Sequence, residues 1–400
     1  MDKLKELLEQ IEHPFFLYNL DFLNTHLDKI INDKPDFLDI WFACKANPLT
    51  YILNIIKNKN LGIDVASQGE LDQARYLGFQ DSRIISTGPA KPPRYLKQLM
   101  NLNVVVLESL NQALWLNEEA KKSNSKINVL LRLQLDWAQL KDQTSVLGGT
   151  EITPFGISPE SWINSEVKTY SHLNILGTHA FQWGNILKPS ELEFVWDHCL
   201  QASTQLANDI GFNLNIVDLG GGLGLDYEDP ENRLDFNLIC TSLEKLREKH
   251  SIPKIWLELG RYAVGECGSY FTQIIDRKTV RGQEILVVEG GINQLARPAL
   301  TSQSFPCITH QTSSPTQDKT HFQVHGPLCT SLDKLGTFNL SSNITIGDWL
   351  EFKLCGAYGF TESMPFFLGH SLPGEVVLKD NSLKIIRHPE SARSYLKLDY

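Results

Sequence analysis

The chain has 400 residues, 42% of them hydrophobic and 21% charged, and a formal net charge of −10. This length fits two domains, and an acidic chain without a basic cluster is a poor nucleic-acid binder. No apolar run reaches the roughly 20 residues of a membrane span. Seven cysteines without a CxxC pair predict reduced thiols rather than a disulfide framework or a bound metal.

The N-terminal segment, residues 1–19, places Leu4, Leu7, Leu8 and Ile11 at helical spacing. Charged residues interrupt this pattern, so the segment lacks the continuous apolar core of a signal peptide. We therefore expect a cytoplasmic protein whose first helix packs on the C-terminal domain.

Eight short β-rich runs then alternate with longer helical patterns. The runs are LDIWFAC (38–44), LGIDV (61–65), RIIST (83–87), NVVVL (103–107), INVLLRLQL (127–135), LNILGTHAF (173–181), LNIVDL (214–219) and KIWLEL (254–259). Eight strand-helix alternations over about 250 residues are typical of a (β/α)₈ barrel, which we place at residues 20–261. A doubly wound open sheet is the alternative.

After Gly260 the pattern changes to strand-like segments separated by turn residues, such as YFTQIIDRKTV, EILVVEGG and GEVVLKD. No long helical pattern returns. We expect a C-terminal β-domain, a sandwich or barrel, over residues 262–400.

Polar and glycine-rich residues fall where the predicted barrel strands end. They are Lys45 after the first run, His179 and Phe181 at the end of the sixth, Gly220, Gly221 and Gly222 after the seventh, and Glu258 and Arg261 at the eighth. Each has an ordinary structural reading, such as a surface lysine, a tight turn or an ion pair. Their joint placement at the C-terminal mouth of a barrel predicts an active site that binds a small molecule.

The strings WFACKANP, DVASQGEL, VDLGGGLG, ELGR, GGINQLARPAL, GPLCTSLD and CGAYGF occur in this order. In this they resemble the alanine-racemase-fold decarboxylases that use pyridoxal 5′-phosphate (PLP), the diaminopimelate and ornithine decarboxylase family. The resemblance covers residues 15 to about 375 and implies a PLP-dependent amino-acid decarboxylase.

The resemblance also implies residue roles. Lys45 is the Schiff-base lysine, since covalent catalysis needs an amine that can lose its proton. Glu258 faces the pyridine nitrogen and favours its protonated form. The residues that bind the phosphate are Gly220, Gly221, Gly222, Arg261 and Tyr358, and Cys329 is the proton donor.

The sequence departs from the family at the residue that stacks on the cofactor ring. In GTHAFQWGN, Phe181 stands at the position of the usual histidine, and Trp183-Gly184 replaces Gly-Ser. Because residues two apart on a strand face the same side, we expect both His179 and Phe181 to point into the mouth. Either could stack on the ring.

Two other functions compete with decarboxylation. A racemase of the same fold needs acid/base groups on both faces of its substrate, whereas GPLCTSLD supplies a cysteine, as in the decarboxylases. A PLP carrier or an inactive regulator would lack the β-domain, Lys45 or Cys329. The family also implies a homodimer in which Cys329 of one subunit serves Lys45 of the other.

The substrate prediction rests on Thr330. Decarboxylases of basic amino acids follow the catalytic cysteine with a carboxylate, whereas this chain has Cys329-Thr330-Ser331. An unpaired buried ammonium costs several kcal/mol, so we predict an acylated distal amine. The alternative is that Asp333 binds a free ammonium.

Arg297 matches a family arginine that meets a distal carboxylate, although Thr301 replaces its usual tyrosine companion. The tail FFLGHSLPGEVVL resembles the branch found in siderophore and antibiotic pathways. We therefore predict a citryl-diamino acid such as citryl-ornithine, with a carrier-bound aminoacyl group as the alternative.

Overall fold

The computed structural model describes residues 2–137, 152–181, 183–391 and 393–396. It divides into two compact units. The first comprises Leu27–Leu225 and Arg233–Ala263. The second comprises Met1–His26, Asp226–Asn232 and Val264–Tyr400. Residues 20–26, which we expected in the barrel domain, thus group with the second unit. The insert 226–232 also groups with the second unit, although barrel residues flank it on both sides in the sequence.

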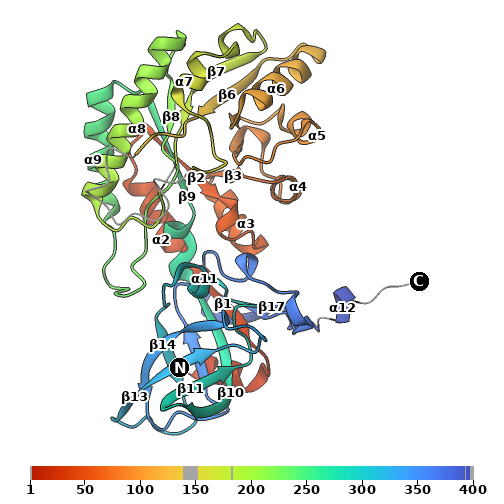
Figure 1. The fold of residues 1–400 in the computed structure, drawn as a ribbon, viewed down its shortest axis with the longest axis vertical. Helices are drawn as coiled ribbons and strands as arrows, with labels where there is room; N and C mark the ends of the chain where they lie inside the picture. The colour runs from red at the N-terminus through yellow and green to blue at the C-terminus, as the bar shows by residue number, and fades with distance from the viewer. Residues whose placement is uncertain (1, 138–151, 182, 392, 397–400) are drawn as a thin grey trace. The chain divides into compact units, whose positions relative to one another are not determined.

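Eight parallel strands form a closed barrel in the first unit (Figure 1). They are β2 (Leu38–Ala43), β3 (Gly62–Val65), β4 (Ile84–Ser86), β5 (Val104–Leu107), β6 (Ile127–Arg132), β7 (Leu173–His179), β8 (Ile216–Asp218) and β9 (Lys254–Leu259). β9 returns to pair with β2, with Leu38 opposite Ile255. The predicted (β/α)₈ barrel is confirmed, and the open sheet is excluded.

Helices surround the barrel in Figure 1, and they belong to this unit except for residues 20–26 and 264. They are α2 (Leu20–Asp33), α3 (Thr50–Asn58), α4 (Gln68–Tyr76), α5 (Pro93–Leu96), α6 (Leu110–Lys122), α7 (Pro159–Ile163), α8 (Pro189–Ile210), α9 (Phe236–His250) and α10 (Arg261–Val264). Serine side chains cap two of them, since Ser67 Oγ accepts from Glu70 N and Ser109 Oγ accepts from Gln112 N. Each cap begins its helix directly after a strand, and this leaves the strand-to-helix loops at the barrel mouth.

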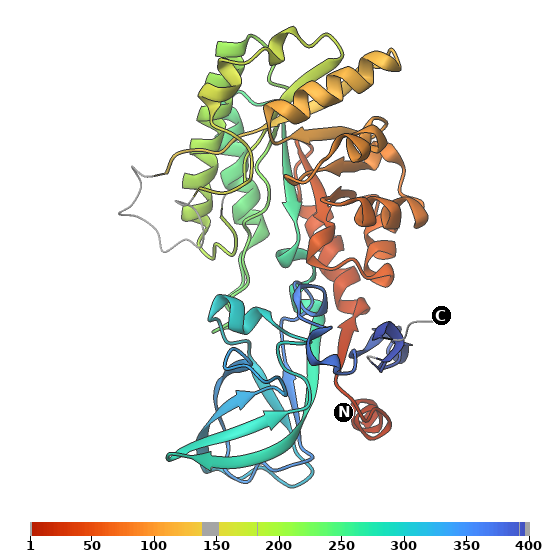
Figure 2. The same cartoon turned by 45° about the vertical axis from the view of Figure 1, so that its right-hand side comes forward.

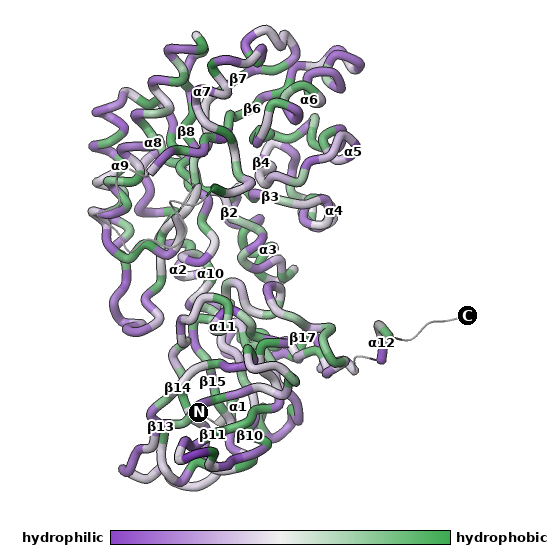
Figure 3. Tube along the Cα trace, viewed as in Figure 1, coloured by the Kyte–Doolittle hydropathy of each residue, from purple (hydrophilic) through white to green (hydrophobic). Residues whose placement is uncertain are grey.

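The barrel strands are apolar on both faces because helices cover their outer side. All four residues of β5, for example, are buried. Figure 3 shows hydrophobic stretches along the barrel strands and alternating colours along the outer helices. A charged residue inside such a strand therefore needs a partner in the protein, and the site described below consists of such residues.

The second unit is built on a nine-stranded sheet. Its strands are β1 (Phe15–Asn19), β10 (Gly268–Val280), β11 (Gln283–Val288), β12 (Cys307–His310), β13 (Lys319–His325), β14 (Lys334–Ser341), β15 (Trp349–Phe352), β16 (Gly374–Lys379) and β17 (Ser382–Arg387). Figure 2 shows β1, in red, beside the long β10, with which it pairs antiparallel. The predicted C-terminal β-domain is confirmed.

Three short helices complete this unit: α1 (Asp2–Gln10), α11 (Arg297–Thr301) and α12 (Arg393–Leu396). Leu7 and Ile11 join a core cluster with Phe15, Phe271 and Val376. The N-terminal segment thus packs on the sheet through its apolar face. Within the described residues, no helix is both long and apolar enough to cross a membrane.

Candidate functional site

A cavity of about 490 Å³ lies at the C-terminal ends of the barrel strands. β2 ends at Ala43, and the following 3₁₀ turn Cys44–Ala46 carries Lys45 into the cavity wall. Lys45 Nζ lies 5.8 Å from the centre of the Phe181 ring. Thr87, Arg132 and Phe155 also line the cavity. The structure therefore brings Lys45 and Phe181, 136 positions apart in the sequence, to one binding space.

Asp64, on β3, is a buried carboxyl group that accepts a hydrogen bond from Thr87 Oγ1 at 2.8 Å. Burial raises the pKa of Asp64 to about 7, and the negative charge of Glu258 adds to the rise while Lys45 opposes it. An ordinary aspartate has a pKa of about 3.9, so burial favours the protonated form of Asp64.

His179, Asp218 and Glu258 form a second buried cluster, with ligand-capable atoms within 4.8 Å of one another. His179 Nε2 lies 3.2 Å from Oε1 of Glu258. Burial, helped by the charge of Arg132, holds the pKa of His179 well below its usual value. The imidazole is therefore neutral and suited to donate its Nε2–H to Glu258.

The two carboxyl groups of this cluster repel each other. Burial raises the pKa of Asp218 well above its usual value, and the charge of Glu258 adds to the rise. Burial also raises the pKa of Glu258, whereas Lys45 and Arg132 oppose that rise. Because two adjacent buried charges are costly, the cluster favours a protonated carboxyl group more than exposed carboxylates would.

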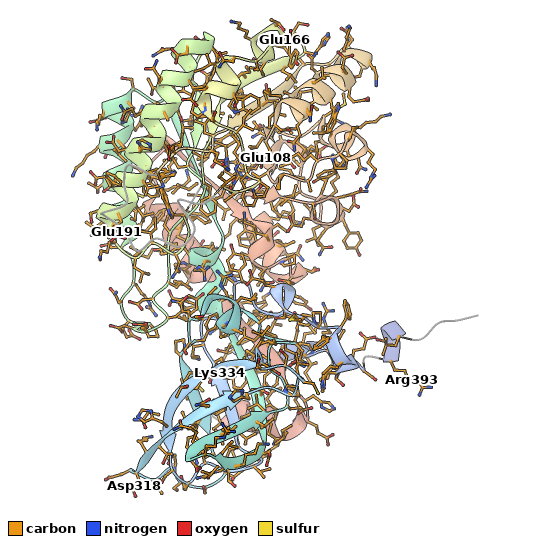
Figure 4. The ribbon with its side chains drawn as sticks, in the orientation of Figure 1. Glu108, Glu166, Glu191, Asp318, Lys334 and Arg393 are labelled. Atoms are coloured by element: carbon orange, nitrogen blue, oxygen red, sulfur yellow. The ribbon has the colours of Figure 1, made fainter. Side chains whose placement is uncertain are left out.

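Lys91, Glu108 and Arg132 form a buried charge network beside the cavity. Glu108 Oε1 lies 2.7 Å from Arg132 Nη1 and 4.0 Å from Lys91 Nζ, and its Oε2 accepts from Gly156 N at 2.9 Å. Burial lowers the pKa of Lys91 to about 8, although Glu108 opposes this. Figure 4 labels Glu108 inside the barrel unit and Glu166 at its periphery.

Arg132 connects this network to the cavity. Its guanidinium lies 4.6 Å from the centre of the Phe155 ring, a cation–π distance. Burial would raise the pKa of Glu108, but the charges of Arg132 and Lys91 outweigh burial and lower it. Glu108 therefore stays ionised and fixes the guanidinium at the cavity wall.

The glycine turn after β8 approaches other backbone too closely for side chains. A Cβ on Gly220, which has a φ of +62°, would lie 2.5 Å from Phe181 Cβ. A Cβ on Gly221 would lie 2.4 Å from the carbonyl oxygen of Glu258. Gly220 N donates to Asp218 Oδ1 at 2.8 Å. The Gly221 and Gly222 amides have no partner among the described residues, so Gly220 is not the free amide donor expected from the sequence.

His179 and Phe181 differ in their surroundings, and their common face at the barrel mouth stays a prediction. β7 ends at His179, so the two-residue period does not extend to Phe181. His179 is completely buried against Glu258, whereas the Phe181 ring lines the cavity 5.8 Å from Lys45 Nζ. Of the two candidates, Phe181 therefore has the position for stacking on a ring bound near Lys45.

Cys329 and Thr330 belong to the second unit, in the loop between β13 and β14. Cys329 is exposed, and Thr330 is partly buried. Asp333 is 1% exposed, and its two carboxylate oxygens accept from Ile292 N at 2.8 Å and Leu328 N at 2.7 Å. Asp333 therefore stabilises the loop that carries Cys329. Because both of its oxygens already accept backbone amides, it is poorly placed to bind a substrate ammonium.

Arg297 and Tyr358 also belong to the second unit. Arg297 Nη1 donates to both carboxylate oxygens of Glu362, at 2.9 and 2.7 Å. Its guanidinium lies 4.6 Å from the centre of the Tyr358 ring. Thr301, which stands in place of the tyrosine companion, bonds the Arg297 carbonyl oxygen from its Oγ1 at 2.8 Å. Arg297 thus already has one carboxylate partner within the chain.

Asp64, Lys91, Glu108 and Arg132 were not among the candidates expected from the sequence. Each was nevertheless marked by a simple signal: Asp64 and Arg132 lie in apolar barrel strands, Glu108 directly follows one, and Lys91 lies in the loop after β4. Applying the strand-end rule to the second to fifth β-rich runs and the loops after them would have found them.

A family model described as the pyridoxal-dependent decarboxylase, pyridoxal binding domain, matches residues 25–265. The L-glutamyl (BtrI acyl-carrier protein) decarboxylase of Niallia circulans is 25% identical, over 98% of this chain and 94% of the relative. The 2-((L-alanin-3-ylcarbamoyl)methyl)-2-hydroxybutanedioate decarboxylase of Staphylococcus aureus is 28% identical, over 93% of this chain and 96% of the relative.

The fold is also that of a solved enzyme. The crystal structure of diaminopimelate decarboxylase from Helicobacter pylori complexed with L-lysine superposes with a TM-score of 0.85 at 22% identity. It covers 98% of this chain and 97% of that one.

The residues at the barrel mouth fit PLP. Lys45 offers an amine in the cavity wall, and the amides of Gly221 and Gly222 lack partners among the described residues, as an anion site requires. Glu258 offers a buried acid with a raised pKa. The chain belongs to the pyridoxal-dependent decarboxylases and is a PLP-dependent amino-acid decarboxylase.

Proposed function

We propose that this enzyme removes the α-carboxylate of an amino acid whose distal amine is acylated, such as the citryl-diamino acid citryl-ornithine. The observation that carries the proposal is the loop after Cys329. Thr330 and Ser331 bear no charge, and the nearby carboxylate of Asp333 is bonded to two backbone amides. A buried distal ammonium would lack a partner at this loop, at a cost of several kcal/mol.

Arg297 supports an acidic acyl group. Only Nη1 is bonded to Glu362, and Nη2 has no hydrogen bond to the described residues. Arginine offers five N–H donors, so a substrate carboxylate can bind Nη2 without displacing Glu362. We infer that Arg297 binds the distal carboxylate.

The relatives support this substrate class. The S. aureus enzyme is named for an alanine joined at C3 through a carbamoyl group to a hydroxybutanedioate, so its distal nitrogen is acylated. The N. circulans enzyme is named for an L-glutamyl group on a carrier protein. A carrier-bound aminoacyl group is therefore the second candidate, because its distal end is likewise uncharged.

We assign the following roles to the residues at the barrel mouth. When bound, PLP supplies the electron sink for the charge left at Cα after CO₂ departs. Lys45 holds the cofactor covalently through Nζ, and Phe181 stacks on its ring. Glu258 shares a proton with the pyridine nitrogen, and His179 orients Glu258 through Nε2. The phosphate is held by Gly221, Gly222, Arg261 and Tyr358.

Cys329 donates the proton that replaces the carboxylate at Cα, from its Sγ. We propose that the enzyme is a homodimer and that Cys329 of one subunit serves Lys45 of the other. The second unit exposes large apolar side chains suited to such an interface: Leu300, Leu332, Met364, Phe366, Phe367 and Leu368.

Steady-state kinetics of CO₂ release test the substrate assignment. We expect citryl-ornithine to exceed free ornithine, lysine and diaminopimelate in kcat/KM by roughly two orders of magnitude or more. A carrier-bound aminoacyl group is measured alongside. A higher kcat/KM for a free diamino acid would contradict an acylated substrate.

Thr330→Glu is the matched variant, because it restores the missing carboxylate beside Cys329. It should raise kcat/KM for free ornithine by about tenfold or more and lower it for citryl-ornithine. The control is Thr330→Gln, whose side chain has the size of glutamate but no charge. It should not raise kcat/KM for free ornithine.

A further inference from the structure

A second cavity, of about 420 Å³, lies within the second unit. Pro298 and Ala299 of α11 line it, together with Ser331 and Leu332 from the loop that carries Cys329. Its remaining wall comes from the segment after α11 and the start of β14. The cavity thus adjoins both Arg297 and Cys329 in sequence but shares no residue with the lining of the barrel cavity.

The polar lining is open to solvent, with four exposed hydroxyls and a half-buried lysine, so an incoming ligand can reach these groups. Lys334 is the only charged residue among the lining residues, and the hydroxyls are those of Ser302, Ser304, Ser331 and Thr337. Within the described part of the chain, none of these five side chains has a hydrogen-bond or ion-pair partner. A cavity with an unpaired ammonium, several hydroxyls and no carboxylate favours an anionic ligand. Figure 4 labels Lys334.

Gly336 keeps this wall open. A Cβ at this position would lie 2.8 Å from Ser304 Oγ and 2.6 Å from the Phe338 ring. The residue also has a φ of +149°, which L side chains disfavour. Any larger residue would therefore push against a hydroxyl of the cavity lining.

We propose that this cavity binds the anionic end of the substrate's acyl group, with Lys334 as its counter-ion and the four hydroxyls as donors. This inference rests on the proposed function and names the subsite that selects the acyl group. The ligand chemistry is a carboxylate- or phosphate-bearing group. It comes from a hydroxy polycarboxylate on the substrate or from the phosphodiester of a carrier-protein arm.

Ligand binding to the PLP-loaded enzyme tests the subsite without turnover. We expect Lys334→Ala to weaken citrate binding, measured by titration calorimetry, by about tenfold or more. Lys334→Arg should retain most of it. The control is Lys319→Ala, which removes an exposed lysine of β13 in the same unit and should bind like the wild type.

Kinetics then identify the source of the anion. For a carboxylate source, Lys334→Ala should lower kcat/KM for citryl-ornithine about 10- to 100-fold through KM, and leave N-acetyl-ornithine within about twofold. For a phosphodiester source, the loss should appear with an amino acid joined through its side-chain carboxyl to phosphopantetheine, and not with the same amino acid joined to pantetheine.

The subsite proposal is wrong if the wild type and Lys334→Ala bind citrate equally well and also bind phosphopantetheine equally well. Circular dichroism must show that both proteins are folded. If citrate binding depends on Lys334 but free ornithine is the best substrate, the proposed function fails while the anion site stands. The two failures are therefore distinguishable.

Discussion

The barrel unit and the second unit hold their functional groups in opposite ways. In the barrel, the side chains of Lys91, Glu108 and His179 are at most 1% exposed, and their partners are other residues of the same unit. In the second unit, Cys329 is exposed and Arg297 and Glu362 are partly exposed.

The difference in burial suggests different tasks for the two sets of groups: the buried ones are preorganised for chemistry, and the exposed ones are suited to recognise a ligand. Charges held in a low-dielectric interior interact strongly and need little rearrangement during a reaction. Groups at a surface interact weakly until a ligand or another subunit excludes water. We infer that the barrel unit supplies most of the groups around the cofactor, and that the second unit adds Cys329 and Tyr358 and selects the substrate. The predictions below test this division, from the largest expected effect to the smallest.

Replacing Lys45 should abolish the reaction. Lys45→Ala removes the amine in the barrel cavity, and we expect CO₂ release to fall by roughly four orders of magnitude or more. Borohydride reduction followed by mass spectrometry of the wild type should place the cofactor on Lys45. Lys188→Ala, an exposed barrel lysine, is the control. An adduct on the buried Lys91 would show that the wrong lysine has been assigned.

Mixing inactive subunits tests whether the two units cooperate across a dimer. Lys45→Ala and Cys329→Ala should each be nearly inactive alone. If each site combines Lys45 of one subunit with Cys329 of the other, half of the randomly mixed dimers contain one intact site. Activity should then recover to about a quarter of the wild-type value. No recovery despite subunit exchange, verified by native mass spectrometry, would mean that the site lies within one chain.

Replacing Glu258 should impair the chemical step more than binding. Glu258→Gln keeps the size and the His179 contact but removes the acid, so we expect kcat to fall about 10²- to 10³-fold. KM should change by only about a factor of three. Glu191→Gln, on the outer helix α8, should change neither. A loss confined to KM would make Glu258 a substrate-binding residue.

The pH dependence of stability should reveal the buried Lys91. Its pKa in the folded chain, about 8, lies below the value of about 10.4 expected when unfolded. The folded state binds fewer protons between these values, so its stability rises as the pH rises through that window. The rise is at most about 3 kcal/mol.

Urea unfolding of the cofactor-free protein at pH 7, 8.5 and 10 measures this rise. Lys91→Met should lose it, whereas Lys122→Met, which removes an exposed lysine, should keep it. If the free energy of unfolding changed with pH equally in the wild type and in Lys91→Met, Lys91 would be charged in the folded state over this whole pH range.

Local pattern was enough to predict the barrel and the β-domain, and the resemblance of seven short strings to a known family implied the cofactor. Strand periodicity, turn residues and the strings around Lys45 and Glu258 act over a few residues, so they can be read from the sequence alone. The strand-end rule placed Lys45 and Phe181 at one mouth because parallel strands in a barrel end on the same side.

Only the tertiary structure decided how the side chains pair. Glu108 and Arg132 are 24 positions apart and meet because β5 and β6 are neighbours in the closed barrel. Asp333 accepts from Ile292 N, 41 positions away, and this contact favours a loop-holding role over the ammonium-binding alternative. His179 meets Glu258, 79 positions away, and Phe181 lies near Lys45. Such pairings depend on which strands adjoin and where each one ends, and spacing along the chain encodes neither.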